Sequence, residues 1–172
     1  MILKYIEEKA DETLRKHGFY SLPIDVLKLA EELGVNIEPA NLAPDISGIF
    51  VIKNDKPYIR YSKNDIKTRV RFTIAHELGH WLLHSKSTPL FIDRTPKIMF
   101  RNIESSTGEI HKEREANSFA AALLMPEILI KKEMSKLKMG DAVEQLADIF
   151  EVSTQAMSFR LSNLGFDLGI FN

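Results

Sequence analysis

The chain has 172 residues, the length of one ordinary domain, and 44% of them are hydrophobic, which is enough for a buried core. With 23 basic and 24 acidic residues the formal net charge is −1, so no global field draws the chain to nucleic acid. The absence of cysteine excludes disulfides and thiolate metal sites, so a bound metal would be held by histidine and carboxylate groups.

Two helices are predicted at the start of the chain. Apolar residues recur at helical spacing from Ile2 to His17, and Gly18 is a typical helix end. A second helix is expected from Ser21 to Leu33, with Pro23 near its first turn and Gly34 at its end. Charged residues near the start argue against a secretory signal, and the apolar runs are too short to cross a membrane. We therefore expect a cytoplasmic protein.

Strand signals follow the second helix. Ile49–Lys53 and Pro57–Tyr61 have the composition of strands, and the residues between them, 54–56, are typical of a hairpin turn. Val35–Glu38 is a candidate third strand. These segments predict a small antiparallel sheet that packs beside the next helix.

That next helix carries the most informative residues of the chain. His76-Glu77-Leu78-Gly79-His80 spells His-Glu-x-x-His within a proline-free stretch, 64–84, that is predicted to be helical. Successive helical residues are rotated by about 100°, so His76 and His80 lie about 40° and roughly one turn apart, and two imidazoles can hold one metal ion. Glu77 is rotated by about 100° from His76 and can act as general base on a water molecule. The pattern favours a zinc-dependent hydrolase over a chance pairing of ordinary histidines.

A catalytic zinc usually has three protein ligands and one open position, so one more ligand is needed. His84 is a poor choice, because it lies about 12 Å along the helix axis from His76 and about 80° around it. We expect His84 to cap the helix end or to bond to the backbone, with lining of the cleft as the alternative.

The better source of a third ligand is residues 111–124, which contain strong helix formers and end at Met125-Pro126. One face of this predicted helix combines a carboxylate with small residues: Glu113, Ala116, Asn117, Ala120 and Leu124. The small residues allow close approach to the motif helix, which makes Glu113 the expected ligand, and Asn117 can orient a ligand histidine. Glu115 points about 200° away from Glu113 and is interpreted as a solvated charge.

Two strings of residues carry a family resemblance. Arg71-Phe-Thr-Ile-Ala-His-Glu-Leu-Gly-His-Trp-Leu-Leu-His84 and Glu113-Arg-Glu-Ala-Asn-Ser-Phe-Ala-Ala-Ala-Leu-Leu-Met-Pro126 closely resemble the ImmA/IrrE family of bacterial and phage metallopeptidases. The flanks 22–34 and 143–153 are also similar, so the resemblance covers roughly residues 20–165. It implies that His76, His80 and Glu113 are zinc ligands and that Glu77 is the catalytic acidic residue. It also implies that the substrate is a helix-turn-helix transcriptional repressor, cut once to release its genes.

The arrangement also resembles gluzincin peptidases, in which an edge strand beside the metal binds extended substrate by strand addition. Ile49–Lys53 or Pro57–Tyr61 is the candidate strand, with a purely structural hairpin as the alternative. Residues 85–110 have little periodicity and contain Pro89 and Pro96 among Phe91, Ile98, Met99 and Phe100. This segment is either a long loop or flap over the cleft, or a segment that packs on the core.

Residues 146–164 have the spacing and apolar pattern of a helix-turn-helix. A DNA reader needs several cations, and the second helix offers only Arg160, so direct DNA binding is disfavoured. Packing of the helices or docking of the repressor is favoured instead.

Together these features predict an α+β fold of the zincin type, mostly helical, with a small antiparallel sheet beside the motif helix and a C-terminal helix-turn-helix-like region. We expect a single metallopeptidase domain over residues 1–172, with a core at 20–140 and a C-terminal helical subdomain at about 141–165. No membrane association is expected.

The predicted function is a zinc-dependent endopeptidase that uses one Zn²⁺ to make a site-specific cut in a cognate helix-turn-helix repressor. The alternatives are a non-catalytic regulator that binds and displaces the repressor, and a toxin-system component with another substrate. His111, Tyr58 and Tyr61 are candidates for contacting the substrate or stabilising the oxyanion. The sequence does not indicate the oligomeric state.

Overall fold

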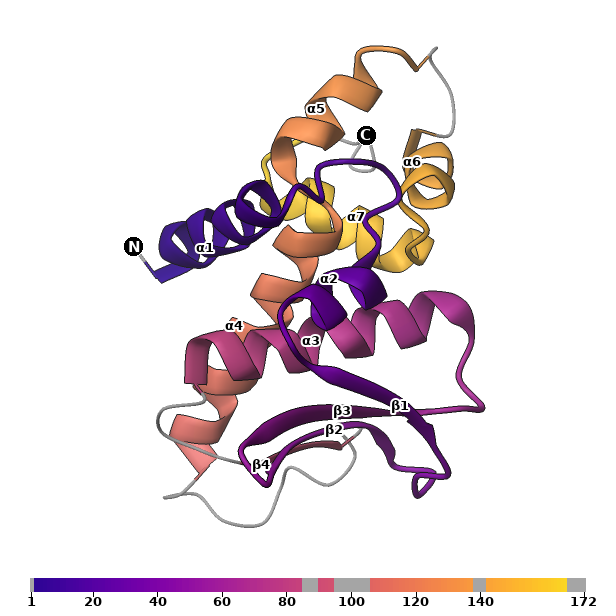
Figure 1. Ribbon diagram of the computed structural model, residues 1–172. Helices are drawn as coiled ribbons and strands as arrows, with labels where there is room; N and C mark the ends of the chain where they lie inside the picture. The colour runs from indigo at the N-terminus through magenta and orange to yellow at the C-terminus, as the bar shows by residue number, and fades with distance from the viewer. Residues whose placement is uncertain (1, 85–89, 95–105, 138–141, 167–172) are drawn as a thin grey trace.

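The computed structural model describes residues 2–84, 90–94, 106–137 and 142–166 (Figure 1). Within these ranges the chain forms seven helices and four strands. Helix α3 (Lys67–His84) lies between the sheet and the other helices, against strands on one side and helices α2 and α4 on the other. The fold is therefore α+β, as the sequence predicts.

The N-terminal helices follow their local signals in part. Helix α1 spans Ile2–His17 and ends at Gly18, whose φ of 75° is left-handed, which confirms both predicted bounds. Helix α2 spans Val26–Glu32, five residues shorter at its start than expected. The Asp25 side chain accepts a hydrogen bond from the Lys28 backbone N–H, so Asp25 is the N-cap and the residues before it lie outside the helix.

The sheet is mixed, which corrects the antiparallel sheet expected from the sequence. Its order is β1-β3-β2-β4, with β1 at Asn36–Ala40, β2 at Ile46–Lys53, β3 at Lys56–Ser62 and β4 at Leu90–Arg94. The β2–β3 hairpin is antiparallel, and β1 pairs in parallel with β3. The chain reverses direction after β1 and again after β2, so β3 returns in the direction of β1 and lies between β1 and β2.

The hairpin turn consists of Asn54 and Asp55, with φ angles of 50° and 58°. Two successive left-handed residues are characteristic of a type I′ turn, which matches the twist of the flanking strands. The predicted turn is therefore confirmed at its first two residues, and Lys56 already belongs to β3, where it pairs with Lys53.

Neither of the two strands proposed to bind extended substrate by strand addition lies at an edge of the sheet. β2 is paired with β3 and β4, and β3 is paired with β1 and β2. That expectation is therefore wrong, because β4 forms from a distant segment and covers the free side of β2. In the described part of the chain, β1 and β4 are the outer strands.

The loop expected over residues 85–110 is also partly wrong. Leu90–Arg94 forms β4, and helix α4 begins at Ser106 and continues to Leu124. Residues 85–89 and 95–105 lie outside the described residues, and with them Pro89, Pro96, Ile98, Met99 and Phe100. Strand β4 forms through its pairing with β2, a contact between distant segments that a local pattern does not reveal.

The core is built where α3 meets the sheet on one side and α4 on the other. Fully buried side chains come from all three layers: Phe50, Ile59, Ile74, Leu78, Phe119 and Leu123. Each such side chain stabilises the fold by about 1.5–3 kcal/mol relative to an exposed one. Because α3 is enclosed on both sides, every residue from 71 to 80 is buried except Phe72, which is half-buried.

The C-terminal region consists of α5 (Glu127–Met134), α6 (Ala142–Phe150) and α7 (Thr154–Asn163). Helices α6 and α7 occupy the segment predicted to hold two helices, and the Ser153 side chain caps α7 by accepting from the Ala156 backbone N–H.

Two buried arginines tie this region to the rest of the fold. Arg71 of α3 donates to the backbone oxygens of Phe150 at 3.2 Å and Glu151 at 3.1 Å. Arg160 of α7 donates to the Met125 backbone oxygen at 3.0 Å and pairs with Glu7 of α1. Because Arg160 is the one basic residue of α7 and is 5% exposed, it is not placed to contact a phosphate backbone.

Candidate metal centre

Helices α3 and α4 bring together the three predicted ligands. His76 Nε2 lies 3.2 Å from one carboxylate oxygen of Glu113, and His80 Nε2 lies 3.1 Å from the other. The two Nε2 atoms are 3.0 Å apart. One ligand atom from each residue lies within 4.8 Å of the others, so the three side chains converge on one point.

The donor set and its spacing fit a divalent metal ion. Two imidazoles and one carboxylate are a typical catalytic zinc set, and they leave a fourth position open. Ligand atoms of a tetrahedral zinc are about 3.4 Å apart when the bonds are about 2.1 Å long, which is close to the spacing of these three side chains. His76 and His80 are buried, and the Glu113 side chain is 27% exposed, so the cluster opens toward solvent on the side of α4.

The close approach of the two helices depends on small residues. A Cβ atom on Gly79 of α3 would lie 3.1 Å from the Ala116 Cα of α4 and 3.2 Å from the Phe119 ring. The helices therefore touch at a residue without a side chain, which leaves Glu113 within reach of both histidines. The sequence suggested this role for the small residues of α4, and the structure adds the glycine inside the motif.

The electrostatics of the cluster give the protonation states that metal binding requires. Burial raises the pKa of Glu113, but hydrogen bonds with His76 and His80 outweigh burial and bring it down to about 2. Burial is the main cause that lowers the pKa of His80 below 6.5. A charged carboxylate and a neutral imidazole are the forms that coordinate metals.

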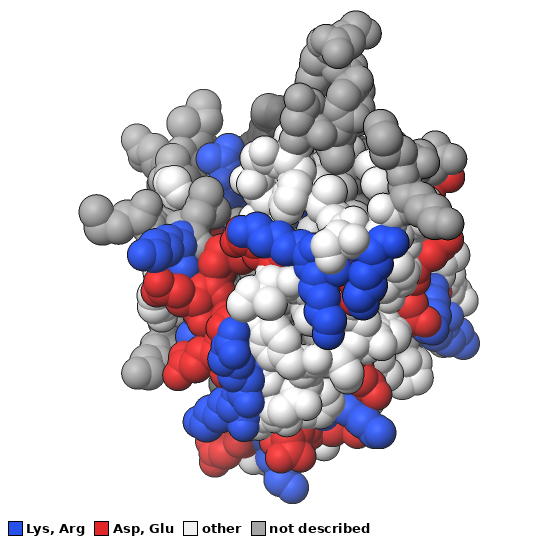
Figure 2. Space-filling view, turned by 90° about the horizontal axis from the view of Figure 1, so that it is seen from above, with Lys and Arg blue, Asp and Glu red and all other residues white. Residues whose placement is uncertain are grey.

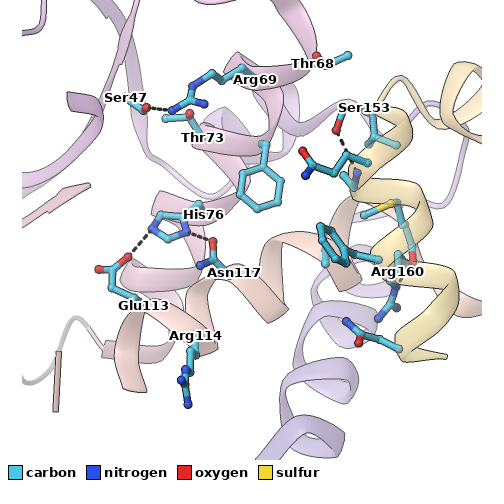
Figure 3. A pocket seen from close by; sticks show the side chains of 18 of the residues that line it. Ser47, Thr68, Arg69, Thr73, His76, Glu113, Arg114, Asn117, Ser153 and Arg160 are labelled. Carbon is cyan, nitrogen blue, oxygen red and sulfur yellow. Dashed lines mark hydrogen bonds and ion pairs between the residues drawn. The ribbon is translucent and has the colours of Figure 1, made fainter. Parts of the chain in front are cut away.

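Asn117 contacts His76, one of the two ligand histidines that the sequence left open as its partner. The His76 Nδ1 and the Asn117 Oδ1 are 3.0 Å apart, and Figure 3 shows Glu113 and Asn117 of α4 on opposite nitrogens of the His76 ring. With Nδ1–H donating to the amide oxygen, Nε2, on the side of Glu113, is the nitrogen that would bind a metal ion.

Glu77 lies outside this cluster, between α3 and β2. It is fully buried, and a Cβ atom on Gly48 of β2 would be 2.8 Å from its Oε1 and 2.5 Å from the Thr73 Cγ2. Gly48 follows a register shift in the pairing of β2 with β4. A glycine inside a strand often marks a bulge or a close approach, so the sequence contained a signal for Gly48 that the analysis of motifs did not use.

His84 and Glu115 are a second pair that sequence reasoning missed. The Nδ1 atoms of His84 and His80 are 3.3 Å apart, and His84 Nε2 lies 2.8 Å from a carboxylate oxygen of Glu115. His84 is therefore buried against a ligand histidine, and Glu115 is not simply a solvated charge. The helical angle of Glu115 gives only the direction of its Cα–Cβ bond, whereas its long side chain reaches sideways to His84.

The other three candidate residues are two tyrosines of the sheet and one histidine of α4. Tyr58 and Tyr61 are half-buried in β3, and His111 is exposed on α4. None of the three lines the pocket beside His76 as the described residues define it. Their role with substrate or oxyanion stays a prediction.

That pocket, which we call the α3–α7 groove, has a volume of about 1020 Å³. It runs from His76 and Glu113 to α7, where Phe159 is 64% exposed (Figure 3). Its lining is largely apolar, with contributions from Ile66, Phe72, Ile110, Ala121, Met125, Val152, Ala156 and Phe159. Arg69 and Arg114 supply positive charge along it.

Fold and site together define a class of protein in which a His-Glu-x-x-His helix packs on a sheet and a second helix adds a carboxylate, as in metallohydrolases. Residues 30–162 match the family model described as the IrrE N-terminal-like domain. The chain belongs to the ImmA/IrrE family.

Two curated relatives support this assignment. Metallopeptidase ImmA of Bacillus subtilis (strain 168) is 25% identical over 134 residues, which are 70% of this chain and 73% of that protein. Uncharacterized immunity region protein 2 of Bacillus phage phi105 is 32% identical over 107 residues, 61% of this chain and 61% of that protein.

A solved structure shares the fold. A Mycobacterium tuberculosis transcriptional regulator superimposes with a TM-score of 0.64 at 17% identity, over 92% of this chain and 46% of that protein. This chain therefore spans less than half of that regulator.

Among the described helices, none combines the length and apolar composition needed to cross a membrane.

Proposed function

We propose that this protein is a zinc-dependent endopeptidase. The observation that carries the proposal is the convergence of His76, His80 and Glu113 on one point. In this proposal these three residues hold one Zn²⁺. When bound, the ion acts as a Lewis acid that polarises the scissile carbonyl and acidifies a water molecule.

Proton transfer and the positioning of the reacting groups are assigned to other residues of the chain. Glu77, next to His76 on α3, takes the proton of the attacking water and passes it to the leaving amine. Asn117 orients the His76 ring by accepting a hydrogen bond from the Nδ1–H of His76. Gly48 leaves room for the Glu77 carboxylate beside β2, so that strand fixes the position of the base.

The α3–α7 groove supports a polypeptide as substrate. Its volume of about 1020 Å³ is slightly above the range for small-molecule pockets, about 300–1000 Å³, and the groove begins at the ligand residues. A largely apolar lining suits several consecutive side chains of a protein segment. The exposed Phe159 on α7 would contact the substrate far from the scissile bond.

The substrate proposed from the family resemblance is a cognate helix-turn-helix transcriptional repressor, cut at one site so that its genes are expressed. Relatives named a metallopeptidase and an immunity region protein agree with that role. We further propose that the protein acts in the cytoplasm and that residues 1–172 work as a single domain, with a core at 20–140 and a C-terminal helical part at about 141–165.

The test is incubation of the purified protein with the repressor encoded by the adjacent gene, followed by gel analysis. The proposal predicts one stable pair of fragments with zinc present and an intact repressor after chelation. An intact repressor that leaves its DNA would instead indicate a non-catalytic regulator, and cleavage of another neighbouring product would indicate a different substrate.

A further inference from the structure

Two side chains outside the ligand set form a chain of hydrogen bonds that ends at His80. Glu115 of α4 lies 2.8 Å from His84 Nε2, and His84 Nδ1 lies 3.3 Å from His80 Nδ1. The rings of His80 and His84 are 5.5 Å apart between centroids. His84 is 7% exposed, so this contact is made away from bulk water.

The direction of these bonds follows from the chemistry of the end group. An ionised carboxylate only accepts hydrogen bonds, so His84 Nε2 carries a hydrogen and donates it to Glu115. In a neutral imidazole the other nitrogen then has a lone pair, and His84 Nδ1 accepts from His80 Nδ1–H. A hydrogen on His80 Nδ1 makes Nε2, which faces Glu113 and His76, the nitrogen that would bind a metal ion there.

We infer that Glu115 and His84 are positioning residues that fix the tautomer and the orientation of His80, as Asn117 does for His76. Both ligand histidines thus have an acceptor on Nδ1, an amide oxygen for one and a histidine–carboxylate pair for the other. We call this pair the His84–Glu115 relay. The inference rests on the proposed metal site and is independent of peptidase activity.

The experiment measures zinc affinity by competition with a chromophoric chelator. Partners that orient ligand histidines typically contribute about ten- to hundredfold to metal affinity. Glu115→Gln is expected to weaken zinc binding about tenfold, and His84→Phe, which keeps a ring of similar shape without nitrogens, by at least as much. The matched control is Glu127→Gln, which removes the charge of an exposed carboxylate paired with Lys131 and should bind zinc like wild type.

The double variant separates a relay from two independent effects. If Glu115 acts only through His84, then His84→Phe with Glu115→Gln binds zinc no more weakly than His84→Phe alone. Losses that multiply in the double variant, or wild-type affinity in Glu115→Gln, would overturn the relay. Thermal unfolding of the metal-free proteins checks that Glu115→Gln folds like Glu127→Gln.

The outcomes also distinguish this inference from the proposed function. A wild-type protein that binds no zinc contradicts the metal centre, and with it the proposed function. A wild type and a Glu115→Gln variant that bind zinc equally well contradict the relay alone. Should His84→Phe fail to fold, the comparison of Glu115→Gln with Glu127→Gln still decides.

Discussion

At the scale of the residue, the proposed function gives neighbours in the motif different roles, and their side chains lie on different sides of α3. His76 and His80 face Glu113, whereas Glu77 is buried against β2 beside Gly48. If the proposed roles hold, metal binding and proton transfer depend on separate side chains and can be separated by substitution.

Glu77→Gln is expected to keep zinc and to lose cleavage of the repressor by about 10²–10⁴-fold, because an amide of the same shape cannot take a proton from water. His80→Ala is expected to lose both zinc and cleavage, since it removes a ligand. Metal analysis and gel analysis of the same preparations measure the two effects. Full cleavage by Glu77→Gln would rule out its role as base.

The pKa shifts in the cluster predict how the metal-free protein responds to acid. The pKa of Glu113 is about 2 instead of 4.5, and burial lowers the pKa of His80 below 6.5, so both groups bind protons more readily in the unfolded chain. Their contribution to the free energy of unfolding is complete above about pH 6.5. On acidification it decreases first because His80 becomes protonated in the unfolded chain and then, below about pH 4.5, because Glu113 does.

Denaturation of the chelator-treated protein over this pH range measures the effect. The free energy of unfolding should decrease monotonically on acidification. In Glu113→Gln the free energy of unfolding should depend less on pH below about pH 4.5, because the variant lacks the carboxylate that titrates there. An unchanged acid limb in this variant would show that other groups dominate.

The residues of the motif can be identified from the sequence because they are close together and form a known metal-binding pattern. Glu113 could be proposed from the face that it shares with small residues, since helical geometry is regular. The contact between His84 and Glu115 could not be proposed, because it depends on how α3 meets α4. An angle along one helix does not contain that information.

At the scale of the element, the packing of β2 on α3 is set by Gly48. Gly48→Ala would place a methyl group 2.5 Å from the Thr73 Cγ2 and 2.8 Å from the Glu77 Oε1. We expect cleavage to fall while zinc is retained, because the carboxylate must move, and we expect a loss of about 1–3 kcal/mol in stability from overpacking.

The matched control is Gly108→Ala in α4, where an added Cβ would have no neighbour within 4 Å. That change is expected to be neutral or to stabilise by up to about 1 kcal/mol, because alanine favours a helix. Chemical denaturation and the cleavage assay measure both variants. Equal activity in Gly48→Ala and Gly108→Ala would contradict the role of Gly48.

Helices were predicted better than the sheet. Helix α1 has a periodic apolar face and a glycine end, so both of its bounds follow from local sequence. The parallel pairing of β1 with β3 and the addition of β4 join segments that are distant in sequence. Local periodicity carries no information about such pairing, so the mixed sheet and its edges required the structure.

At the scale of the whole molecule, charge does not favour one class of macromolecular partner. On the face shown in Figure 2, side chains of Lys and Arg and side chains of Asp and Glu both surround a central area of other residues. This mixture agrees with the formal net charge of −1. A protein substrate that contacts the apolar α3–α7 groove is therefore consistent with the surface.

Zinc should also stabilise the whole fold, because its ligands come from α3 and α4 and an unfolded chain does not hold them together. At a free zinc concentration of about 100 times the dissociation constant, the gain is about 2.7 kcal/mol. For a chain of this length that corresponds to a rise in Tm of roughly 5–10 °C. Thermal unfolding with and without zinc measures it, and an equal rise in His80→Ala would contradict the site.

The proposed metal centre is tested most directly by anomalous diffraction at the zinc edge from crystals of the zinc-loaded protein. We expect one strong peak per chain, bonded at about 2.0–2.2 Å to Nε2 of His76, Nε2 of His80 and the carboxylate of Glu113. A peak at another place, or the three side chains pointing apart with no peak between them, would contradict it.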